Sequence, residues 1–182
     1  MIGGHIEIYR EKGSSKWAYI YEKNTAFPQS KNVEAGKAVT ANLIVKKEVF
    51  ENLEGFNSKL KSGGDWEFSK RAVQAGYSLL YDDNVVVKHP ARESIRAIFK
   101  KQKRLSAWGY LNARKRFGYS GLRIVAGNLY YGLGKVFRSA KTGKKINEKT
   151  IIVVISFGLY LFKSLFQLMI VLGFLKPENI RE

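Results

Sequence analysis

No cysteine occurs among the 182 residues of this chain, and proline occurs only three times. The lack of cysteine excludes disulfide bonds, thiolate zinc sites and cysteine nucleophiles, and it fits a reducing compartment. The N-terminus shows no basic segment followed by an apolar one, so no signal peptide is predicted. Hydrophobic residues are not scarce: at 45% they suffice for a buried core, which excludes disorder by composition.

Acidic residues are scarce in one block of the chain. Residues 1–87 hold 12 basic and 11 acidic side chains, residues 88–149 hold 17 and 2, and residues 150–182 hold 3 and 2. Nearly all of the net charge of +17 therefore lies in residues 88–149. Such a block typically meets anionic phospholipid or nucleic acid.

Short apolar runs between turn residues predict a mixed α/β chain. The last two expected strands flank an Asp-Asp-Asn turn, which is typical of a reversal between strands. Strands are predicted at residues 5–9, 38–45, 77–81 and 85–87.

Helical spacing and helix stop signals account for much of the remaining chain. Residues 10–36 show neither pattern and are predicted to be a loop that holds at most one short helix. Gly118 and Gly121 mark a break before an apolar segment at 122–140 and a basic linker at 141–149. Helices are predicted at residues 46–53, 65–75 and 92–116.

Residues 151–175 form an apolar run with a single charge. A helix of this length reaches roughly 37 Å, enough to cross the hydrocarbon core of a bilayer with tilt. Its polar side chains share one helical face. That face would turn toward another helix if the segment spans the membrane, or toward the headgroups if it lies in the interface. The polar side chains are Ser156, Tyr160, Lys163, Ser164 and Gln167.

Two carboxylates, Asp65 and Glu67, directly follow a Gly-Gly turn at the start of an expected helix. A carboxylate at a helix N-terminus stays ionised and is held rigidly, which suits a base that removes a proton from a hydroxyl group. A structural interpretation is also open, in which Asp65 caps the helix and Glu67 forms a surface ion pair with Arg71 at i+4.

Five segments that surround this turn occur in a defined order. They are Ile2-Gly3-Gly4, residues 36–50, Leu53-Glu54-Gly55-Phe56-Asn57, Gly64-Asp65-Trp66-Glu67-Phe68-x-x-Arg71 and Val85-Val86-Val87-Lys88-His89. In this order they resemble the acceptor-side half of an inverting family 2 glycosyltransferase with a GT-A fold. The resemblance covers roughly residues 2–117.

The resemblance implies that Asp65 is the catalytic base, which takes the proton of the acceptor hydroxyl as that hydroxyl attacks the anomeric carbon. The family has an acidic pair here, whereas this chain has Gly64 as the first member, so no role is assigned to a first acid. Asn42 and Trp66 each have a second interpretation, as a satisfied polar residue in a strand and as part of the core. The residues expected to bind substrate are Asn42, Gly63, Gly64, Trp66, Glu67 and Arg71.

His89 ends the three-valine segment and precedes Pro90. In metal-dependent relatives a histidine at this place helps to hold a divalent ion or contacts the diphosphate leaving group, so the resemblance implies a metal role for His89. The other interpretation is a histidine satisfied by local hydrogen bonds. The expected cofactor is Mg or Mn, whose main ligands would come from an Asp-x-Asp motif. This chain lacks that motif, because Asp82 and Asp83 are adjacent, so the ligands are expected on an upstream segment.

The expected fold is α/β: a partial GT-A fold without its N-terminal nucleotide-binding half, followed by basic amphipathic helices and a C-terminal apolar helix. Residues 1–117 are expected to form the acceptor-side half-domain, residues 118–149 a basic membrane-proximal helical segment, and residues 150–176 a transmembrane or interfacial helix. The other half is expected on a separate chain or to have been lost by truncation. The isolated chain is therefore expected to be inactive or poorly folded.

These features predict a fragment of a hexosyltransferase that moves a sugar from a nucleotide-sugar donor to a lipid-linked or polysaccharide acceptor in cell-envelope biosynthesis. The Gln-x-x-Arg-Trp signature of processive synthases is absent, since residues 102–105 match it poorly, and transfer of one sugar at a time is favoured. The basic block beside the apolar run predicts contact with anionic membrane lipids. The positive-inside rule then places the catalytic part in the cytoplasm, at the cell membrane.

Two other functions remain open. Basic residues interleaved with Trp108, Tyr110, Phe117 and Tyr119 would also suit a membrane-tethered protein that grips nucleic-acid phosphates and stacks bases, although nucleic acid is the less favoured partner. The third possibility is a non-catalytic scaffold descended from a glycosyltransferase. A scaffold would be insensitive to Asp65→Asn, whereas the enzyme would not.

Overall fold

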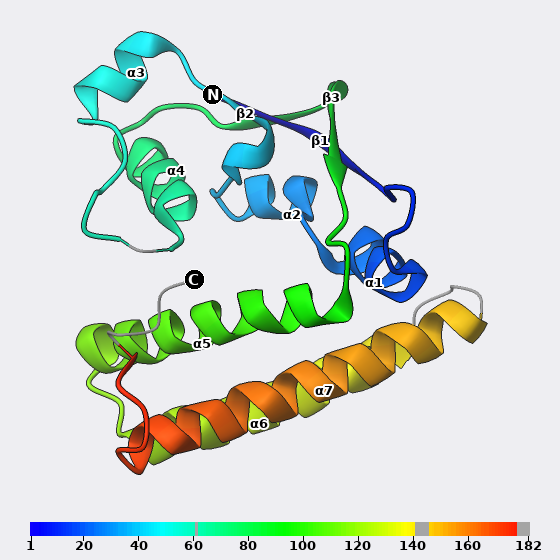
Figure 1. Cartoon of the computed structure of the whole chain (residues 1–182). Helices are drawn as coiled ribbons and strands as arrows, with labels where there is room; N and C mark the ends of the chain where they lie inside the picture. Colours follow the sequence, from blue (N-terminus) through cyan, green and yellow to red (C-terminus); the bar gives the residue numbers. More distant parts are fainter. Residues whose placement is uncertain (61, 141–145, 178–182) are drawn as a thin grey trace. The chain divides into compact units, whose positions relative to one another are not determined.

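The structure is a computed structural model that describes residues 1–60, 62–140 and 146–177 (Figure 1). The chain divides into two compact units. Unit 1 holds Met1–Glu11 and Thr25–Ala91, and unit 2 holds Lys12–Asn24 and Arg92–Glu182. The strands lie in unit 1, and helices make up most of the remainder, so the mixed α/β class is confirmed. The greater part of the predicted basic linker, residues 141–145, lies outside the described residues.

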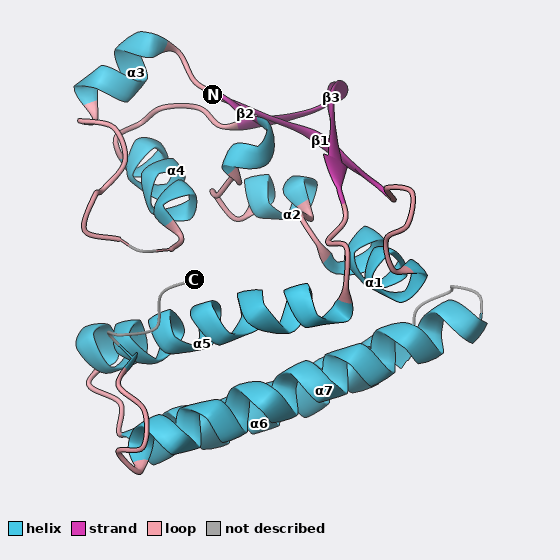
Figure 2. Ribbon diagram, viewed as in Figure 1, coloured by secondary structure: helices cyan, strands magenta, loops and turns pink. Residues whose placement is uncertain are grey.

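Unit 1 is built on a three-stranded sheet in the order β2-β1-β3 (Figure 2). The central strand, β1 (Ile2–Tyr9), is antiparallel to β2 (Leu43–Ile44) and parallel to β3 (Leu80–Pro90). Ile6 and Ile8 of β1 are buried while His5, Glu7 and Tyr9 are exposed, which is the period-two pattern that predicted this strand. A short helix, α2 (Gln29–Glu34), packs against β1 and β3.

β3 is one continuous strand, so the prediction of two strands on either side of an aspartate-rich turn is wrong. The register with β1 shifts within the strand: Gly4 pairs with Asp82, but the next residue, His5, pairs with Val86. Asp82 Oδ1 accepts hydrogen bonds from the backbone N–H of Asn84 at 2.8 Å and from its side-chain amide at 3.0 Å. The aspartate and asparagine side chains therefore make the hydrogen bonds that are typical of a turn, but they make them in a β-bulge inside one strand.

The bulge makes one phenol unusually hard to ionise. Tyr81 donates a 2.6 Å hydrogen bond to Asp83 Oδ1, which raises the pKa of Tyr81 to about 12. Because the pKa in the folded chain exceeds the unfolded value of about 10, this bond stabilises the fold below pH 10 and is lost as the pH rises through 12. We expect the absorbance at 295 nm to show the late titration of Tyr81, a signal that is absent in Tyr81→Phe and moves toward pH 10 in Asp83→Asn. Titration of Tyr81 near pH 10 in the unmodified chain would contradict this.

The predicted strand at residues 38–45 is mostly wrong, since only its β2 portion pairs and the residues before β2 form a 3-10 helix, η1 (Thr40–Asn42). Side chains, and not a neighbouring strand, satisfy the backbone here. The Gln29 side chain accepts from Val39 N at 3.0 Å and donates to Asn42 O at 2.9 Å. A strand pattern carries no information about such partners.

Residues 10–36 contain two helices, α1 (Lys16–Thr25) and α2, so their prediction as mainly a loop is wrong. One of the three buried residues of α1 is the acid Glu22, which interrupts the apolar periodicity. Its carboxylate accepts a hydrogen bond from Arg92 N at 2.7 Å and pairs with the Arg92 guanidinium. The partner lies 70 residues away, beyond any local pattern.

Two predicted helices of unit 1 are confirmed to within one residue: α3 (Lys47–Asn52) and α4 (Gly64–Gln74). The rings of Phe50, Phe56 and Phe68 pack against one another with centroids 5.1 to 5.5 Å apart. This ring cluster joins α3, the turn that follows it and α4, and Phe68 is fully buried.

Unit 2 contains, besides α1, the helices α5 (Ile95–Phe117), α6 (Gly121–Ala140) and α7 (Ile146–Val171). α5 begins after Ser94, whose hydroxyl accepts a hydrogen bond from a backbone N–H of the first turn, and it ends at Gly118 in the left-handed conformation. The predicted helix and the predicted break are therefore confirmed.

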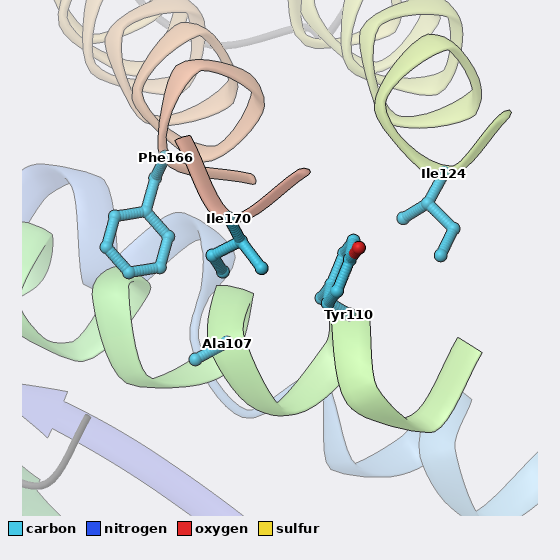
Figure 3. Packing of buried hydrophobic residues seen from close by; sticks show 5 residues of the cluster. All are labelled: Ala107, Tyr110, Ile124, Phe166 and Ile170. Atoms are coloured by element: carbon cyan, nitrogen blue, oxygen red, sulfur yellow. The ribbon is translucent and has the colours of Figure 1, made fainter. Parts of the chain in front are cut away.

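The three long helices of unit 2 share one core (Figure 3). Ala107 and Tyr110 of α5 meet Ile124 of α6 and Phe166 and Ile170 of α7. A second cluster, nearer the start of α5, joins this helix to α1 and α7. Burial of these side chains is the main force that holds the helices together.

The polar face predicted within residues 151–175 turns inward, toward neighbouring helices. Ser156, Ser164 and Gln167 are all buried. Gln167 accepts a 2.6 Å hydrogen bond from Asn128 Nδ2 of α6 and donates a 3.0 Å bond to Ser106 O of α5. One side chain thus ties α7 to both of its neighbours.

Candidate active site

The carboxylate of Asp65 lies in the first turn of α4 and is partly exposed. Oδ1 accepts a hydrogen bond from Trp66 N at 2.9 Å, and Oδ2 accepts one from Thr40 N at 3.4 Å. The residue at the N-cap position is Gly63, so the interpretation of Asp65 as the helix cap is wrong. The free N–H groups at the start of α4 favour a negative charge at this place.

A buried serine fixes α4 against the segment that carries Thr40. Ser69 Oγ lies 2.7 Å from Asp65 O and accepts from Ala38 N at 3.2 Å. Ser69 is completely buried. Since the same helical turn holds Ser69 and Asp65, this contact determines where the carboxylate lies relative to Thr40.

Trp66 follows Asp65 and is 44% exposed, so its interpretation as a core residue is wrong. The ammonium group of Lys37 lies 4.8 Å from the centre of the indole ring. A ring with one cationic neighbour offers an apolar face and a charge to a polar ligand. Lys37, Asp65 and Trp66 therefore form one partly exposed group of side chains.

Glu67 and Arg71 form the ion pair that their i+4 spacing predicts, with contacts of 3.0 and 3.2 Å. The guanidinium also donates to Leu53 O and, at 2.8 Å, to Gly55 O. Its hydrogen bond to Glu67 raises the pKa of Arg71, although burial opposes the effect. These bonds fasten the turn after α3 onto α4. The predicted role of Glu67 and Arg71 in substrate binding stays a prediction.

Asn42 is 95% buried, and its side-chain amide joins two strands. Nδ2 donates to His5 O at 2.7 Å and to Val85 O at 2.8 Å, which lie on the two strands at the bulge. Val85 is one of the residues that the register shift leaves without a pairing partner on β1, so the amide of Asn42 provides a partner for its carbonyl. Substrate contact by Asn42 stays a prediction, and the geometry adds a structural role.

His89 lies near the end of β3, where its ring contacts Phe27 with centroids 4.8 Å apart. Nδ1 is 2.8 Å from Pro90 O, which leaves Nε2 as the atom for a metal ion. Within residues 1–60, 62–140 and 146–177 no group of three or more histidine, aspartate or glutamate side chains could hold a metal together. The described residues therefore do not make a complete Mg or Mn site around His89.

The structure brings Gly63, Gly64, Asp65 and Trp66 together at the start of α4, as the sequence predicts. Sequence reasoning missed the residues that hold this group in place. Most of them act through backbone N–H groups or through side-chain bonds to backbone, and Lys37 acts through its contact with the Trp66 ring, none of which leaves a pattern in a single sequence. These residues are Gln29, Lys37, Thr40 and Ser69.

Gly63 and Gly64 offer a matched test of the turn before Asp65. Gly63 has φ of +76°, and a Cβ at either glycine would meet no atom within 4 Å. We expect Gly63→Ala to destabilise the fold by about 1–2 kcal/mol, because the left-handed region disfavours a side chain. Gly64→Ala, in the same open space but with ordinary backbone angles, should be neutral or stabilise by up to about 1 kcal/mol. Urea denaturation measures both, and equal effects would contradict the backbone argument.

Comparison with known proteins relates the chain to one class of enzyme. No protein-family model matches the chain, and no solved structure matches it. Over 106 residues, however, the chain is 35% identical to a protein named Glycosyltransferase AglE from Haloferax volcanii. The matched stretch is 58% of this chain and 34% of that protein. The chain is thus related to a glycosyltransferase, and it spans about a third of that relative's length.

Proposed function

We propose that this chain supplies the acceptor-side part of an inverting, family 2 glycosyltransferase with a GT-A fold. The observation that carries the proposal is the 35% identity to a glycosyltransferase over 106 residues. The partly exposed carboxylate of Asp65 at the start of α4 supports it. The donor is a nucleotide sugar, and the acceptor is a lipid-linked or polysaccharide hydroxyl.

In the proposed reaction Asp65 acts as the general base. Its carboxylate takes the proton of the acceptor hydroxyl while the hydroxyl oxygen attacks the anomeric carbon of the donor sugar. The bond from that carbon to the nucleoside diphosphate breaks, the diphosphate leaves with the electron pair, and the configuration inverts. The two backbone N–H groups that bond Asp65 keep its oxygens in a fixed direction.

Other residues of the site have supporting roles in this proposal. Trp66 and Lys37 offer the acceptor an apolar ring face and a cation beside the base. Glu67 and Arg71 position α4 by holding the turn after α3. Gly63 provides the left-handed turn that starts the helix at Asp65.

The proposed Mg or Mn cofactor would help to bind the donor diphosphate. His89 is the one proposed ligand on this chain, and the remaining ligands would come from a partner half-domain that binds the nucleotide. Exposed apolar side chains on the sheet support such a partner, since Ile44, Leu80, Val86 and Val87 are between 39% and 63% exposed.

We place the protein at the cytoplasmic face of the cell membrane, in contact with anionic lipids. Among the described residues there is one helix, α7, that is long enough and apolar enough to cross a bilayer. The excess of basic residues ahead of it supports contact with the anionic lipids of the cytoplasmic leaflet. The nucleic-acid alternative is weakened because Tyr110, one of its proposed stacking residues, is only 4% exposed in the core of unit 2 (Figure 3).

The test is turnover of a panel of nucleotide sugars in membranes, with Mg or Mn supplied. The chain is expressed alone and together with the polypeptide encoded immediately upstream. Turnover that requires both polypeptides would support the proposal with its partner half-domain. Absence of turnover across the panel in both preparations would favour the scaffold and count against an enzyme.

A further inference from the structure

The long apolar helix of unit 2 has a neighbour that restricts how it can meet a membrane. α7 has 26 residues, which is about 39 Å of helix and enough to span a bilayer. It is nevertheless packed along most of its length against α5. Ile98 meets Ile155 and Leu159 toward one end, and the core cluster of Figure 3 joins the two helices toward the other.

α5 cannot accompany α7 into hydrocarbon. Its 23 residues hold eight lysines and arginines and no acid. Two of the exposed cations, Lys100 and Lys103, stand beside Phe99, whose ring packs edge-on against Phe162 in the middle of α7. A spanning α7 with this packing would carry those charges to the centre of the bilayer, which is strongly unfavourable.

α6 and α7 form a close pair that adds a second apolar surface. A Cβ at Gly132 would approach the Tyr160 ring to 2.6 Å, and one at Gly121 would approach Val171 to 2.6 Å. Glycine at both positions therefore permits the helices to lie unusually near each other. Because α6 and α7 lie so close together, their exposed side chains form one continuous surface.

Exposed apolar side chains follow this pair in two stripes at helical spacing. A groove between the stripes is lined by residues of α6 and α7 alone. The stripes form the apolar face of unit 2, which is made of Leu122, Leu129, Leu133 and Phe137 on α6 and of Val154, Phe157, Leu161, Leu165 and Leu172 on α7.

Cations gather on the α5 side of the same pair. A pocket of about 330 Å³ is lined by Arg123 of α6 and Lys163 of α7 together with Gly109 and Ala113 of α5. Lys163 is the single charge in the apolar run of α7. One side of unit 2 is thus apolar, and the other side carries the positive charge.

We propose that unit 2 lies in the plane of an anionic membrane and that α7 does not span it. The apolar face enters the acyl region of one leaflet, while Arg123, Lys163 and the cations of α5 meet the phosphate headgroups. The apolar face and the cations are separated by about one helix diameter, about 10 Å. This is close to the depth to which interfacial helices are buried in the boundary between headgroups and acyl chains. Binding of unit 2 in the plane of the membrane does not require sugar transfer, so the topology of α7 can be measured whether or not the chain is active.

The absence of cysteine makes a direct test possible. Asn147→Cys and Lys176→Cys place single thiols at exposed positions that bracket α7 in the full chain. Each variant is labelled with a membrane-impermeant maleimide in sealed membrane vesicles of right-side-out and inside-out orientation. If α7 lies in the plane, both thiols react in one orientation and neither reacts in the other until the vesicles are lysed. Reaction of one thiol in each orientation would show a spanning helix and overturn the proposal.

Binding to vesicles tests the face itself. Phe157→Ser, Leu161→Ser and Leu165→Ser combined should weaken binding of the purified chain to phosphatidylglycerol vesicles by at least tenfold. Ile44→Ser is the control, since Ile44 is similarly exposed at 51% but lies in unit 1. Phosphatidylcholine vesicles should bind the unmodified chain about tenfold less than anionic ones. Equal losses in the triple variant and the control, or no preference for anionic lipid, would count against the proposal.

Discussion

Asp65→Asn is expected to lower the kcat of sugar transfer by about 10²- to 10⁴-fold, which is the usual contribution of a general base. An amide has the shape of the carboxylate and its oxygen still accepts a hydrogen bond, but it cannot take a proton at neutral pH. The N–H of Trp66 therefore keeps its partner, whereas the longer 3.4 Å bond from Thr40 N is lost to the new NH2 group, so the fold should persist with only a small loss of stability. The measurement is kcat in membranes that contain the complete transferase, together with the melting temperature of the purified chain.

Glu51→Gln is the matched control for this substitution. It removes one negative charge, as Asp65→Asn does, from an exposed surface pair with Lys47 at 3.5 Å. Such a pair contributes at most about 0.5 kcal/mol, so both activity and stability should be unchanged. If Asp65→Asn retained full activity, Asp65 would not be the base and the scaffold interpretation would gain support.

Gly4→Ala should be the most damaging small substitution in unit 1, with a loss of about 1–3 kcal/mol or more in the free energy of unfolding. A methyl group there would overlap Val85 O and the amide nitrogen of Asn42, and would lie 2.7 Å from Val85 Cγ1. Two of these atoms make the hydrogen bond that holds the bulge, so neither can move without breaking it. Chemical denaturation of the purified chain measures the loss.

Gly3→Ala is the control in the same strand. The new methyl group would approach Val33 Cγ2 at 2.8 Å and the Gln29 amide at 3.3 Å, which are side-chain atoms and are farther away than the atoms that a methyl group at Gly4 would meet. Its cost should therefore be clearly smaller than that of Gly4→Ala. If Gly3→Ala lost more stability than Gly4→Ala, the bulge would accommodate a methyl group more easily than the contact with α2 does, which would contradict this prediction.

The elements that were predicted well are those whose buried residues recur at the helical spacing along the sequence. α4 and α5 carry apolar stripes and glycine stops, and their ends were predicted to within a few residues. α7 could be recognised from apolar composition alone, and its buried polar face from the spacing of residues such as Gln167. Each of these signals lies within one helix, so a single sequence contains it.

The elements predicted badly depend on distant partners. α1 is held by Glu22 and its ion pair with Arg92. β2 is short because the Gln29 side chain replaces a strand as the partner of Val39. β3 continues through its bulge because Asn42 bonds Val85 O across 43 residues. None of these pairings leaves a periodic trace.

In the candidate site, too, some residues could be predicted from local sequence and others depend on distant contacts. Asp65 and Trp66 follow a Gly-Gly turn at a helix start, which a reader of the sequence can recognise. Thr40 contributes only its backbone N–H, and any residue other than proline has that group. The residues that present a chemical group were therefore predictable, whereas the residues that aim it were not.

The parallel pairing of β1 with β3 has a consequence for synthesis of the chain. Ile2 pairs with Leu80 and Tyr9 with Pro90, so β1 leaves the ribosome before a partner strand that lies about 80 residues behind it. At ordinary translation rates this delay is about 4–16 s, far longer than helices or hairpins need to form. During that time the edge of β1 that will pair with β3 has no hydrogen-bonding partner, and a chaperone or a premature contact can reach it. Unit 1 therefore completes its sheet only after α2, α3 and α4 have been made.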